Sequence, residues 1–211
     1  MLDDRQKFTA ILLAAGQSSR FEDGAKLTHL INGKPLIAWT LAPLIESKFE
    51  QIIIVTGGHA KAINSILSPF ETQHKNIRTI HNETYNDGMS TSIASGMSLI
   101  KSNIEGVFIC LADMPMIKVE IFTKLSNAYE EERDNQSNKT IFRPAYEGQP
   151  GHPVLFSKKH FSNLSSLNGD KGAKELIQQN KDELKLISVN SSDILIDIDK
   201  KEDLYKLQSK K

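Results

Sequence analysis

The sequence predicts an α/β fold of the three-layer, Rossmann-like type, with helices on both faces of a mostly parallel central sheet. Short apolar runs, typical of buried strands, alternate with stretches of helical periodicity over the first two thirds of the 211 residues. The apolar runs are almost uninterrupted, as expected for strands covered on both faces. No linker, internal repeat or low-complexity tract divides the chain, so we expect a single domain over residues 1–211.

The first two thirds of the chain contain four strand–helix pairs. Each expected strand is a short apolar run closed by small or turn-forming residues, and each expected helix repeats its apolar residues three or four positions apart. In chain order they are a strand at 8–14, a helix at 35–45, a strand at 51–55, a helix at 60–67 that ends before Pro69, a strand at 77–80, a helix at 90–100, a strand at 107–111 and a helix at 119–132.

The last third continues with shorter elements. Residues 140–146 and 152–156 flank the turn-forming sequence Glu147-Gly148-Gln149-Pro150-Gly151, which predicts a hairpin or a pair of neighbouring strands. Further along we expect a helix at 173–179, strands at 184–189 and 194–198, and a closing helix at 202–207.

Composition and charge exclude several classes of function. Lysine plus arginine and aspartate plus glutamate each total 26, so the formal net charge is zero and no basic field favours nucleic acid. No apolar run approaches the ~20 residues of a membrane span, and the charged N-terminus lacks the order of a signal peptide. We therefore expect a cytoplasmic protein with no membrane or nucleic-acid partner. The single cysteine, Cys110, lies in an apolar run and is expected to be a buried small hydrophobe.

Small residues and cations follow the first expected strand. The segment reads Leu13-Ala14-Ala15-Gly16-Gln17-Ser18-Ser19-Arg20. Such a turn lets the backbone approach a ligand, and its successive N–H groups form a concave anion site. Arg20 and Lys26 add positive charge suited to a triphosphate. The pattern equally fits an ordinary turn with a surface arginine and lysine, and it is neither a Walker A loop nor a dinucleotide-binding glycine fingerprint.

Carboxylates occur where two expected strands end. Asp113 follows the strand at 107–111, at the edge where open α/β sheets bind ligands, and a carboxylate beside phosphates is a natural Mg²⁺ ligand. The alternative for Asp113 is a helix cap. In Asp197-Ile198-Asp199 the alternation of a strand places both carboxylates on one face, so one of them could supply a second metal ligand. On spacing alone, a helix cap at Asp199 with Glu202 in the first turn is favoured.

Two further segments are candidates for ligand binding. The first, residues 82–92, is rich in amides and hydroxyls that suit a nucleobase edge, and it also fits a turn followed by a helix cap; its candidate residues are Asn82, Gly88, Met89, Ser90 and Ser92. The second combines two glycine-rich turns with a lone histidine, which is more often structural than functional. Its candidate residues are Arg143, Gly151, His152, Pro153, Gly169, Asp170 and Gly172.

In this order along the chain, the segments resemble the MobA-like nucleotidyltransferases, and within them the molybdenum cofactor cytidylyltransferase, or MocA-like, branch. Ala14-Ala15-Gly16 resembles the cytidylyl enzymes, whereas the guanylyl enzymes usually show Leu-Ala-Gly-Gly there. Gly151-His152-Pro153-Val154 is also typical of the cytidylyl group. The chain departs from the family pattern at Glu22-Asp23-Gly24, which precedes Lys26, and at Lys200-Lys201, which replaces Thr-Pro.

The resemblance implies a nucleotidyltransferase fold with a small acceptor-side β-hairpin, an NTP-binding N-terminal half and an acceptor-binding C-terminal half. It implies transfer of CMP from CTP to the terminal phosphate of molybdenum-molybdopterin. Asp113 and Asp199 would hold Mg²⁺, or Mn²⁺ in its place. Arg20, Lys26 and the backbone of residues 15–19 would hold the phosphates, residues 82 and 90–92 would read base and ribose, and His152 with residues 169–173 would face the pterin. A monomer is expected, with a molybdenum hydroxylase as a transient partner.

Other functions are kept as alternatives. The nearest is the same chemistry with GTP or with another phosphorylated acceptor. A nicotinamide-dependent oxidoreductase ranks low because the glycine fingerprint and a ribose-binding acid are absent from the sequence. A third alternative is a nucleotide-binding chaperone that delivers the cofactor to a molybdenum hydroxylase without catalysing transfer.

Overall fold

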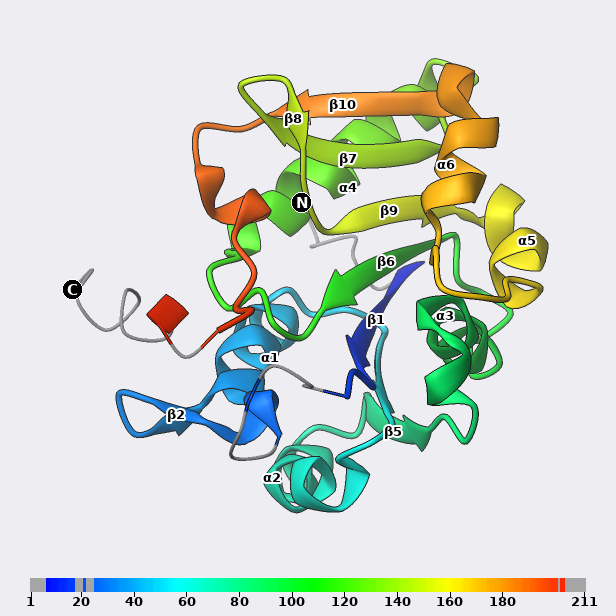
Figure 1. Cartoon of the computed structure of the whole chain (residues 1–211). Coiled ribbons are helices and arrows are strands. Elements are labelled where there is room, and N and C mark those ends of the chain that lie inside the picture. Colours follow the sequence, from blue (N-terminus) through cyan, green and yellow to red (C-terminus); the bar gives the residue numbers. More distant parts are fainter. Residues whose placement is uncertain (1–6, 18–20, 22–24, 201, 204–211) are drawn as a thin grey trace.

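The centre of the structure is an eight-stranded sheet (Figure 1). The computed structural model describes residues 7–17, 21, 25–200 and 202–203. The strands of this sheet are β1 (Phe8–Ala14), β4 (Gln51–Thr56), β5 (Ile77–His81), β6 (Gly106–Leu111), β7 (Ile141–Tyr146), β8 (Gln149–Pro150), β9 (Val154–Ser157) and β10 (Leu184–Ser188). Their order is β10-β7-β9-β6-β1-β4-β5, with β8 paired to β7 outside this path.

The predicted mostly parallel sheet is confirmed. The neighbouring strands β5, β4, β1 and β6 run parallel, so their carboxyl ends lie at one edge of the sheet. β9 runs antiparallel between β6 and β7, and β10 is parallel to β7. The small hairpin is also present: β7 and β8 are joined through Glu147 and Gly148, whose φ angles of 49° and 80° suit a two-residue hairpin turn.

Helices cover both faces of the sheet and complete the three layers. The helices are α1 (Leu36–Glu46), α2 (Ala60–Gln73), α3 (Met89–Met97), α4 (Val119–Asp134), α5 (Phe161–Ser165) and α6 (Lys174–Gln179). Apolar residues of α1, α2 and α4 pack on one face, and those of α3, α5 and α6 pack on the other. β1 contributes to both cores, because Leu12 faces the first group and Ile11 the second. Both side chains are fully buried, which explains the uninterrupted apolar run.

One predicted helix end and one predicted strand are wrong. The second helix does not end before Pro69 but continues to Gln73 with the proline inside it. A proline removes one helical hydrogen bond, here to the carbonyl of Ser65. Residues 65 and 69 are both exposed, so water can satisfy that carbonyl. The strand expected at 194–198 is absent as well: Ser192–Leu195 forms a 3-10 turn, and residues 196–199 belong to neither a helix nor a strand.

Several short elements carry too little periodicity to be predicted. They include a hairpin of β2 (Leu30–Ile31) and β3 (Lys34–Pro35), which lies beside α1 in Figure 1. Asn32 and Gly33 at its tip have positive φ angles, as a tight hairpin turn requires. Most of the closing helix expected at 202–207 lies outside the described residues. Residues 202 and 203, which are described, are helical.

Two expectations from composition can be compared with the structure. Cys110 is buried in β6, and burial raises the pKa of its thiol, as expected of a small core residue. Among the residues that the structure describes, no helix is long and apolar enough to cross a bilayer.

Candidate active site

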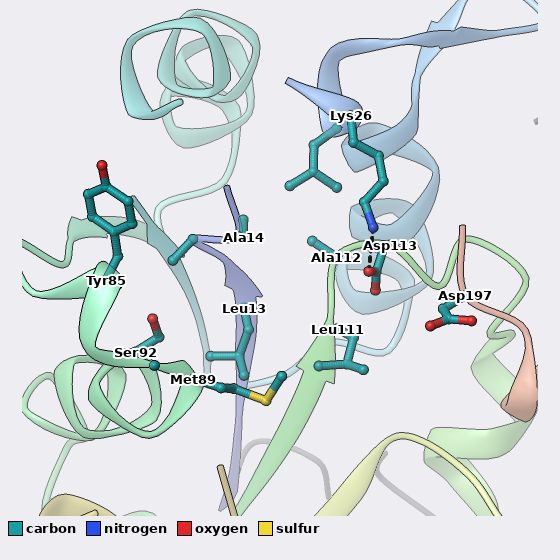
Figure 2. A pocket seen from close by; sticks show the side chains of 14 residues that line it. Leu13, Ala14, Lys26, Tyr85, Met89, Ser92, Leu111, Ala112, Asp113 and Asp197 are labelled. Carbon is teal, nitrogen blue, oxygen red and sulfur yellow. Dashed lines mark hydrogen bonds and ion pairs between the residues drawn. The ribbon is translucent and has the colours of Figure 1, made fainter. Parts of the chain in front are cut away.

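A cleft of about 320 Å³ opens at the carboxyl ends of β1 and β6 (Figure 2). Open α/β sheets bind their ligands at this edge. Its walls come from the turn after β1, the start of α3 and the residues that follow β6. The predicted site residues that line it are Leu13, Ala14, Ala15, Gly16, Lys26, Gly88, Met89, Ser92 and Asp113. Leu27, Tyr85, Leu111, Ala112 and Asp197 also line it. The fold thus gathers segments that are far apart in the sequence.

Lys26 and Asp113 form an ion pair on one wall of this cleft (Figure 2). The Nζ atom of Lys26 lies 2.7 Å from Oδ2 of Asp113 and 3.9 Å from Oδ1 of Asp199. The side chains of Lys26 and Asp113 are only 13% and 25% exposed. Because sheltered charges are screened less than surface charges, the ammonium group offsets the repulsion between the two carboxylates.

Backbone hydrogen bonds fix the position of Asp113. The N–H of Ala112 donates to the carbonyl of Leu13 at 3.1 Å, which extends the pairing of β6 with β1. The hydroxyl of Thr40 in α1 donates to the carbonyl of Ala112 at 2.8 Å. On the other side, the N–H of Ile198 donates to the carbonyl of Asp113 at 2.9 Å. The last of these bonds brings the C-terminal aspartates beside Asp113.

Asp197 and Asp199 both reach this region although they do not lie on a strand. Asp197 lines the cleft, whereas Asp199 contacts it through Lys26. Partial burial raises the pKa of Asp197, and the nearby carboxylates of Asp199 and Asp113 raise it further. Asp197 was not among the predicted site residues, although its spacing from Asp199 placed both on one side. The N–H groups of Asp199 and Lys200 donate to the carboxylate of Asp203, which satisfies these donors.

The aspartates suit a hard divalent cation that is shared with phosphates. Within the described ranges, no three His, Cys, Asp or Glu side chains form a ready-made metal cluster. Mg²⁺ needs only one or two carboxylates when phosphate oxygens and water complete its shell. Lys26 already places a cation within 4 Å of both Asp113 and Asp199, so positive charge is stabilised at this position.

The structure places the side chain of Asn82 away from the cleft, in a buried position. Its Nδ2 donates to the hydroxyls of Thr91 and Ser92 at 2.9 and 3.0 Å, and its Oδ1 accepts from the N–H and hydroxyl of Thr84 at 3.1 and 3.0 Å. Since a primary amide has two donors and two acceptor sites, Asn82 is satisfied within the protein and holds the segment 84–92 together.

Ser90 is buried too, and Tyr85 reaches the cleft in its place. Tyr85 packs on the two glycines that follow β4: a Cβ atom added at Gly57 would lie 2.7 Å from the ring, and one at Gly58 would lie 3.2 Å from it. Tyr85 belongs to the predicted polar segment 82–92 but was not among its candidate residues, because a single aromatic side chain forms no periodic pattern. Tyr85 lies across the cleft from Lys26 and Asp113 (Figure 2).

A second cavity of about 420 Å³ adjoins the first and shares Met89 and Leu111 with it. Arg143 and His152, both predicted acceptor-side residues, line it. Its other lining residues are Ile93, Ile109, Val154, Phe156, Lys171, Ala173, Lys174, Ile177 and Gln178. The cavity therefore combines apolar walls with three cationic side chains, which suits an anionic ligand that carries a flat apolar body.

Arg143 also binds backbone carbonyl groups, whereas the remaining acceptor-side residues line neither cavity. Arg143 donates from Nε to the carbonyl of Gly151 at 2.9 Å and from Nη2 to that of Pro150 at 3.3 Å. A Cβ atom at Gly151 would lie 2.3 Å from the carbonyl oxygen of Ile194, so glycine allows the C-terminal segment to approach. Pro153 lines a small cavity in the core. Gly169, Asp170 and Gly172 lie against the start of α3.

Residues 10–184 match the MobA-like NTP transferase domain. The chain belongs to this family. The matched residues include most of the first cleft, from Leu13 to Asp113, and all residues that line the second cavity. They end before Asp197 and Asp199. The predicted family resemblance is thereby confirmed.

Several named proteins are similar to this MobA-like chain in sequence. The molybdenum cofactor cytidylyltransferase of Escherichia coli is 28% identical over 155 residues, which cover 70% of this chain and 69% of that protein. The nicotine blue oxidoreductase of Paenarthrobacter nicotinovorans is 23% identical over 94% of this chain and 95% of its own length. The bifunctional protein GlmU of Caldicellulosiruptor saccharolyticus is 32% identical over 60% of this chain, which spans only 27% of that protein.

Solved structures agree with the fold. The Rv0371c protein of Mycobacterium tuberculosis superposes with a TM-score of 0.76 at 22% identity, covering 97% of this chain and 98% of the other. A nucleotidyl transferase of Methanothermobacter gives a TM-score of 0.76 at 16% identity over 96% of each chain. At these identities the similarity is one of architecture, and it confirms the predicted Rossmann-like nucleotidyltransferase fold.

Three predicted phosphate-binding residues, Ser18, Ser19 and Arg20, lie outside the described residues, so their assignment stays a prediction. Gln17, just before them, is held in place: its backbone carbonyl lies 3.0 Å from Nε2 of His59, and its side-chain amide donates to the Asn86 side chain. The turn after β1 is therefore tied to the segment after β4 and to the polar segment that carries Tyr85.

Gly57→Ala and Gly16→Ala form a matched pair of tests for this turn. A Cβ atom at Gly57 would lie 2.6 Å from the carbonyl oxygen of Ala15, whereas one at Gly16 would have no atom within 4 Å. We expect Gly57→Ala to lower the free energy of unfolding by about 1–3 kcal/mol, the usual cost of overpacking. Gly16→Ala should leave stability unchanged and weaken nucleotide binding, because it obstructs close approach of phosphates. Urea unfolding and calorimetric titration distinguish these effects, and equal stabilities would contradict the close packing at Gly57.

His152, which lines the second cavity, has a lowered pKa and is neutral at pH 7. Burial and, to a smaller extent, the charge of Arg143 lower its pKa from 6.5 to about 4, although Asp113 and a hydrogen bond with the Ile109 backbone oppose the shift. Its Nδ1 atom is buried and has no hydrogen-bond partner within the described structure. A neutral histidine suits a site that must accept an anionic group without altering its protonation.

The lowered pKa of His152 predicts a loss of stability in mild acid. The unfolded chain binds the proton near pH 6.5, but the folded chain binds it only near pH 4, so stability rises with pH between these values. The contribution is complete above about pH 6.5 and is lost as the pH falls toward 4. As the pH falls from about 6.5 to 4, we expect the unfolding free energy of wild type to decrease relative to that of His152→Gln, which lacks the titrating group. Urea unfolding at several pH values measures it, and a difference that does not change with pH would contradict the prediction.

Proposed function

We propose that this MobA-like domain transfers CMP from CTP to the terminal phosphate of molybdenum-molybdopterin and releases pyrophosphate. The observation that carries the proposal is the pair of adjoining cavities that share Met89 and Leu111. The first cavity has small residues, a lysine and carboxylates for a metal-bound triphosphate. The second has apolar walls and cations for a phosphorylated ring system. A shared wall allows the two substrates to meet.

The residues present are consistent with a direct phosphoryl attack. The second pKa of a phosphate monoester is about 6, so the acceptor phosphate is already mostly dianionic at pH 7 and needs no general base. One of its oxygens forms a bond to the α-phosphorus of CTP, and the bond between that phosphorus and the bridging oxygen of pyrophosphate breaks. Lys26, the turn after β1 and Arg20 would hold the β- and γ-phosphates. The contribution of the chain is positioning and charge neutralisation.

Asp113 and Asp199 are proposed to hold Mg²⁺, with Mn²⁺ as a substitute, and Asp197 lines the same cleft. When bound, such a cation neutralises charge on the phosphate oxygens. The Rv0371c structure was also solved in complex with manganese, which supports this class of ion. In that state Lys26 would exchange the carboxylates for phosphate oxygens, since both are within reach of a flexible four-carbon side chain.

The proposed choice of CTP rests on the resemblance at Ala14-Ala15-Gly16 and on the E. coli cytidylyltransferase. The nearest alternative is GTP, because the probable molybdenum cofactor guanylyltransferase of Thermococcus sibiricus is 32% identical over 51% of this chain. The similarity to nicotine blue oxidoreductase keeps an oxidoreductase as a second candidate. A delivery chaperone for a molybdenum hydroxylase is the third. We further propose that the protein acts as a cytoplasmic monomer.

Pyrophosphate release tests these candidates directly. Purified protein, Mg²⁺ and molybdenum cofactor are combined with CTP, GTP, ATP or UTP in separate reactions. Release with CTP alone supports the proposal, and release with GTP alone changes the base but keeps the mechanism. If the protein is folded but none of the four nucleotides gives pyrophosphate, transferase activity toward this acceptor is contradicted. A reaction with NADH or NADPH and a quinone-type dye then examines the oxidoreductase candidate.

A further inference from the structure

The loop Gly169–Gly172 lies on the start of α3, which forms a wall of the nucleotide cleft. The N–H of Ser90 donates to the carbonyl of Gly169 at 3.1 Å, and the hydroxyl of Ser90 lies 3.5 Å from the carbonyl of Gly172. The first N–H groups of a helix have no partner within the helix, so the loop supplies one of them from a distant part of the chain. In Figure 1 the connection between α5 and α6 lies on the same side of the sheet as α3.

Three glycines permit this contact. Gly88 has a φ angle of 111°, and a Cβ atom there would lie 2.3 Å from Oδ1 of Asp170 and 2.4 Å from the carbonyl oxygen of Gly169. Gly169 and Gly172 also have positive φ angles, of 78° and 55°. Other residues are strained in these conformations, so glycine at these positions favours the shape of the loop.

Met89 connects the loop to both cavities. A Cβ atom at Gly172 would lie 3.0 Å from Sδ of Met89, and Met89 lines the nucleotide cleft and the second cavity alike. Lys171, between the glycines, lines the second cavity. The loop therefore contacts the nucleotide side through Gly88, Met89 and Ser90, although the family resemblance assigned it to the acceptor.

We propose that the loop Gly169–Gly172 positions the turn Gly88–Ser92 for nucleotide binding, acting through Met89 and the backbone of Ser90. This inference rests on the proposed nucleotide site. The helix start would otherwise depend on local contacts of segment 82–92, and a methionine side chain with three rotatable bonds does not fix its own position. The acceptor half of the chain thus contributes to the affinity for the nucleotide before any acceptor binds.

Gly172→Ala and Gly169→Ala provide a matched test. Both substitutions place alanine at a positive φ in the same loop, but only the Cβ at Gly172 meets Met89, since a Cβ at Gly169 has no atom within 4 Å. Binding of CTP with Mg²⁺ is measured by calorimetry without acceptor. We expect Gly172→Ala to weaken binding about 3- to 10-fold more than Gly169→Ala does. In a Met89→Ala background the two glycine variants should become equivalent, because the contact that distinguishes them is gone.

Hydrogen exchange at the amide of Ser90 provides a measurement that needs no nucleotide. Its N–H is bonded to Gly169, so displacement of the loop in Gly172→Ala should accelerate exchange there relative to Gly169→Ala. Equal exchange and equal affinity in the two variants would overturn the inference. If wild type binds none of CTP, GTP, ATP and UTP, the proposed function fails, and the exchange result alone then decides whether the loop positions α3.

Discussion

Replacing Asp113 with asparagine is expected to lower turnover with saturating Mg²⁺ by about 100- to 1000-fold, the range seen when one preorganised electrostatic group is removed from an active site. Asparagine keeps the shape of the side chain and removes its charge. The backbone of Ala112 is held by β1 and α1 and that of Asp113 by the C-terminal segment, so the substitution should leave the fold intact. The large effect would therefore be on the reaction and not on folding.

The control for Asp113→Asn is Asp134→Asn. Asp134 ends α4, is 71% exposed and pairs with Arg133. Asp134→Asn therefore removes the same charge at a position away from the cleft. Pyrophosphate release and thermal unfolding are measured for both variants. Near-normal turnover of Asp113→Asn at saturating Mg²⁺ would contradict the role of Asp113 in metal and phosphate binding.

The main elements could be predicted because each carries its own local signal. β1 is an uninterrupted apolar run that ends in small residues, and its buried neighbours β4 and β6 are similar. The position of Asp113 then follows from parallel topology, since the carboxyl ends of these strands meet. The wrong predictions arose where local sequence patterns fit two structures equally well. Pro69 suggested a helix end because the sequence does not reveal that Ser65 and Pro69 are both exposed, where water can satisfy the carbonyl that the proline leaves unbonded.

Many of the predicted site residues line the two cavities, and those that do not have a common physical explanation. An amide such as Asn82 can read a base or satisfy the backbone around it, and only the structure shows that Thr84, Thr91 and Ser92 use its hydrogen-bonding capacity. Tyr85 was missed because a single aromatic residue in a polar segment forms no hydrophobic pattern that would mark it as a site residue. Side-chain satisfaction and the packing of distant glycines depend on tertiary contacts that sequence spacing does not encode.

Lys26→Met is expected to have two opposite effects. Nucleotide turnover should fall about 10- to 1000-fold, because one cation that neutralises the triphosphate is lost while the length of the side chain is kept. Binding of Mn²⁺ to the free protein should become tighter, by about tenfold or ~1.4 kcal/mol. The ammonium of Lys26 lies within 4 Å of Asp113 and Asp199, so in the free protein it competes with a metal ion for these carboxylates. A loss of positive charge then improves the cation site.

Electron paramagnetic resonance titration of Mn²⁺ without nucleotide measures this effect separately from turnover. Lys26→Arg is the matched control, because a guanidinium keeps the charge beside Asp113 and should hold Mn²⁺ affinity near that of wild type. Equal Mn²⁺ affinity in Lys26→Met, Lys26→Arg and wild type would mean that the ion pair and the metal do not share Asp113. Tighter binding of Mn²⁺ in Lys26→Met alone would show that Lys26 and the metal compete for the carboxylates. A nucleotide that draws Lys26 away would then free the carboxylates for the metal. Metal and nucleotide would in that case bind together more tightly than either binds alone.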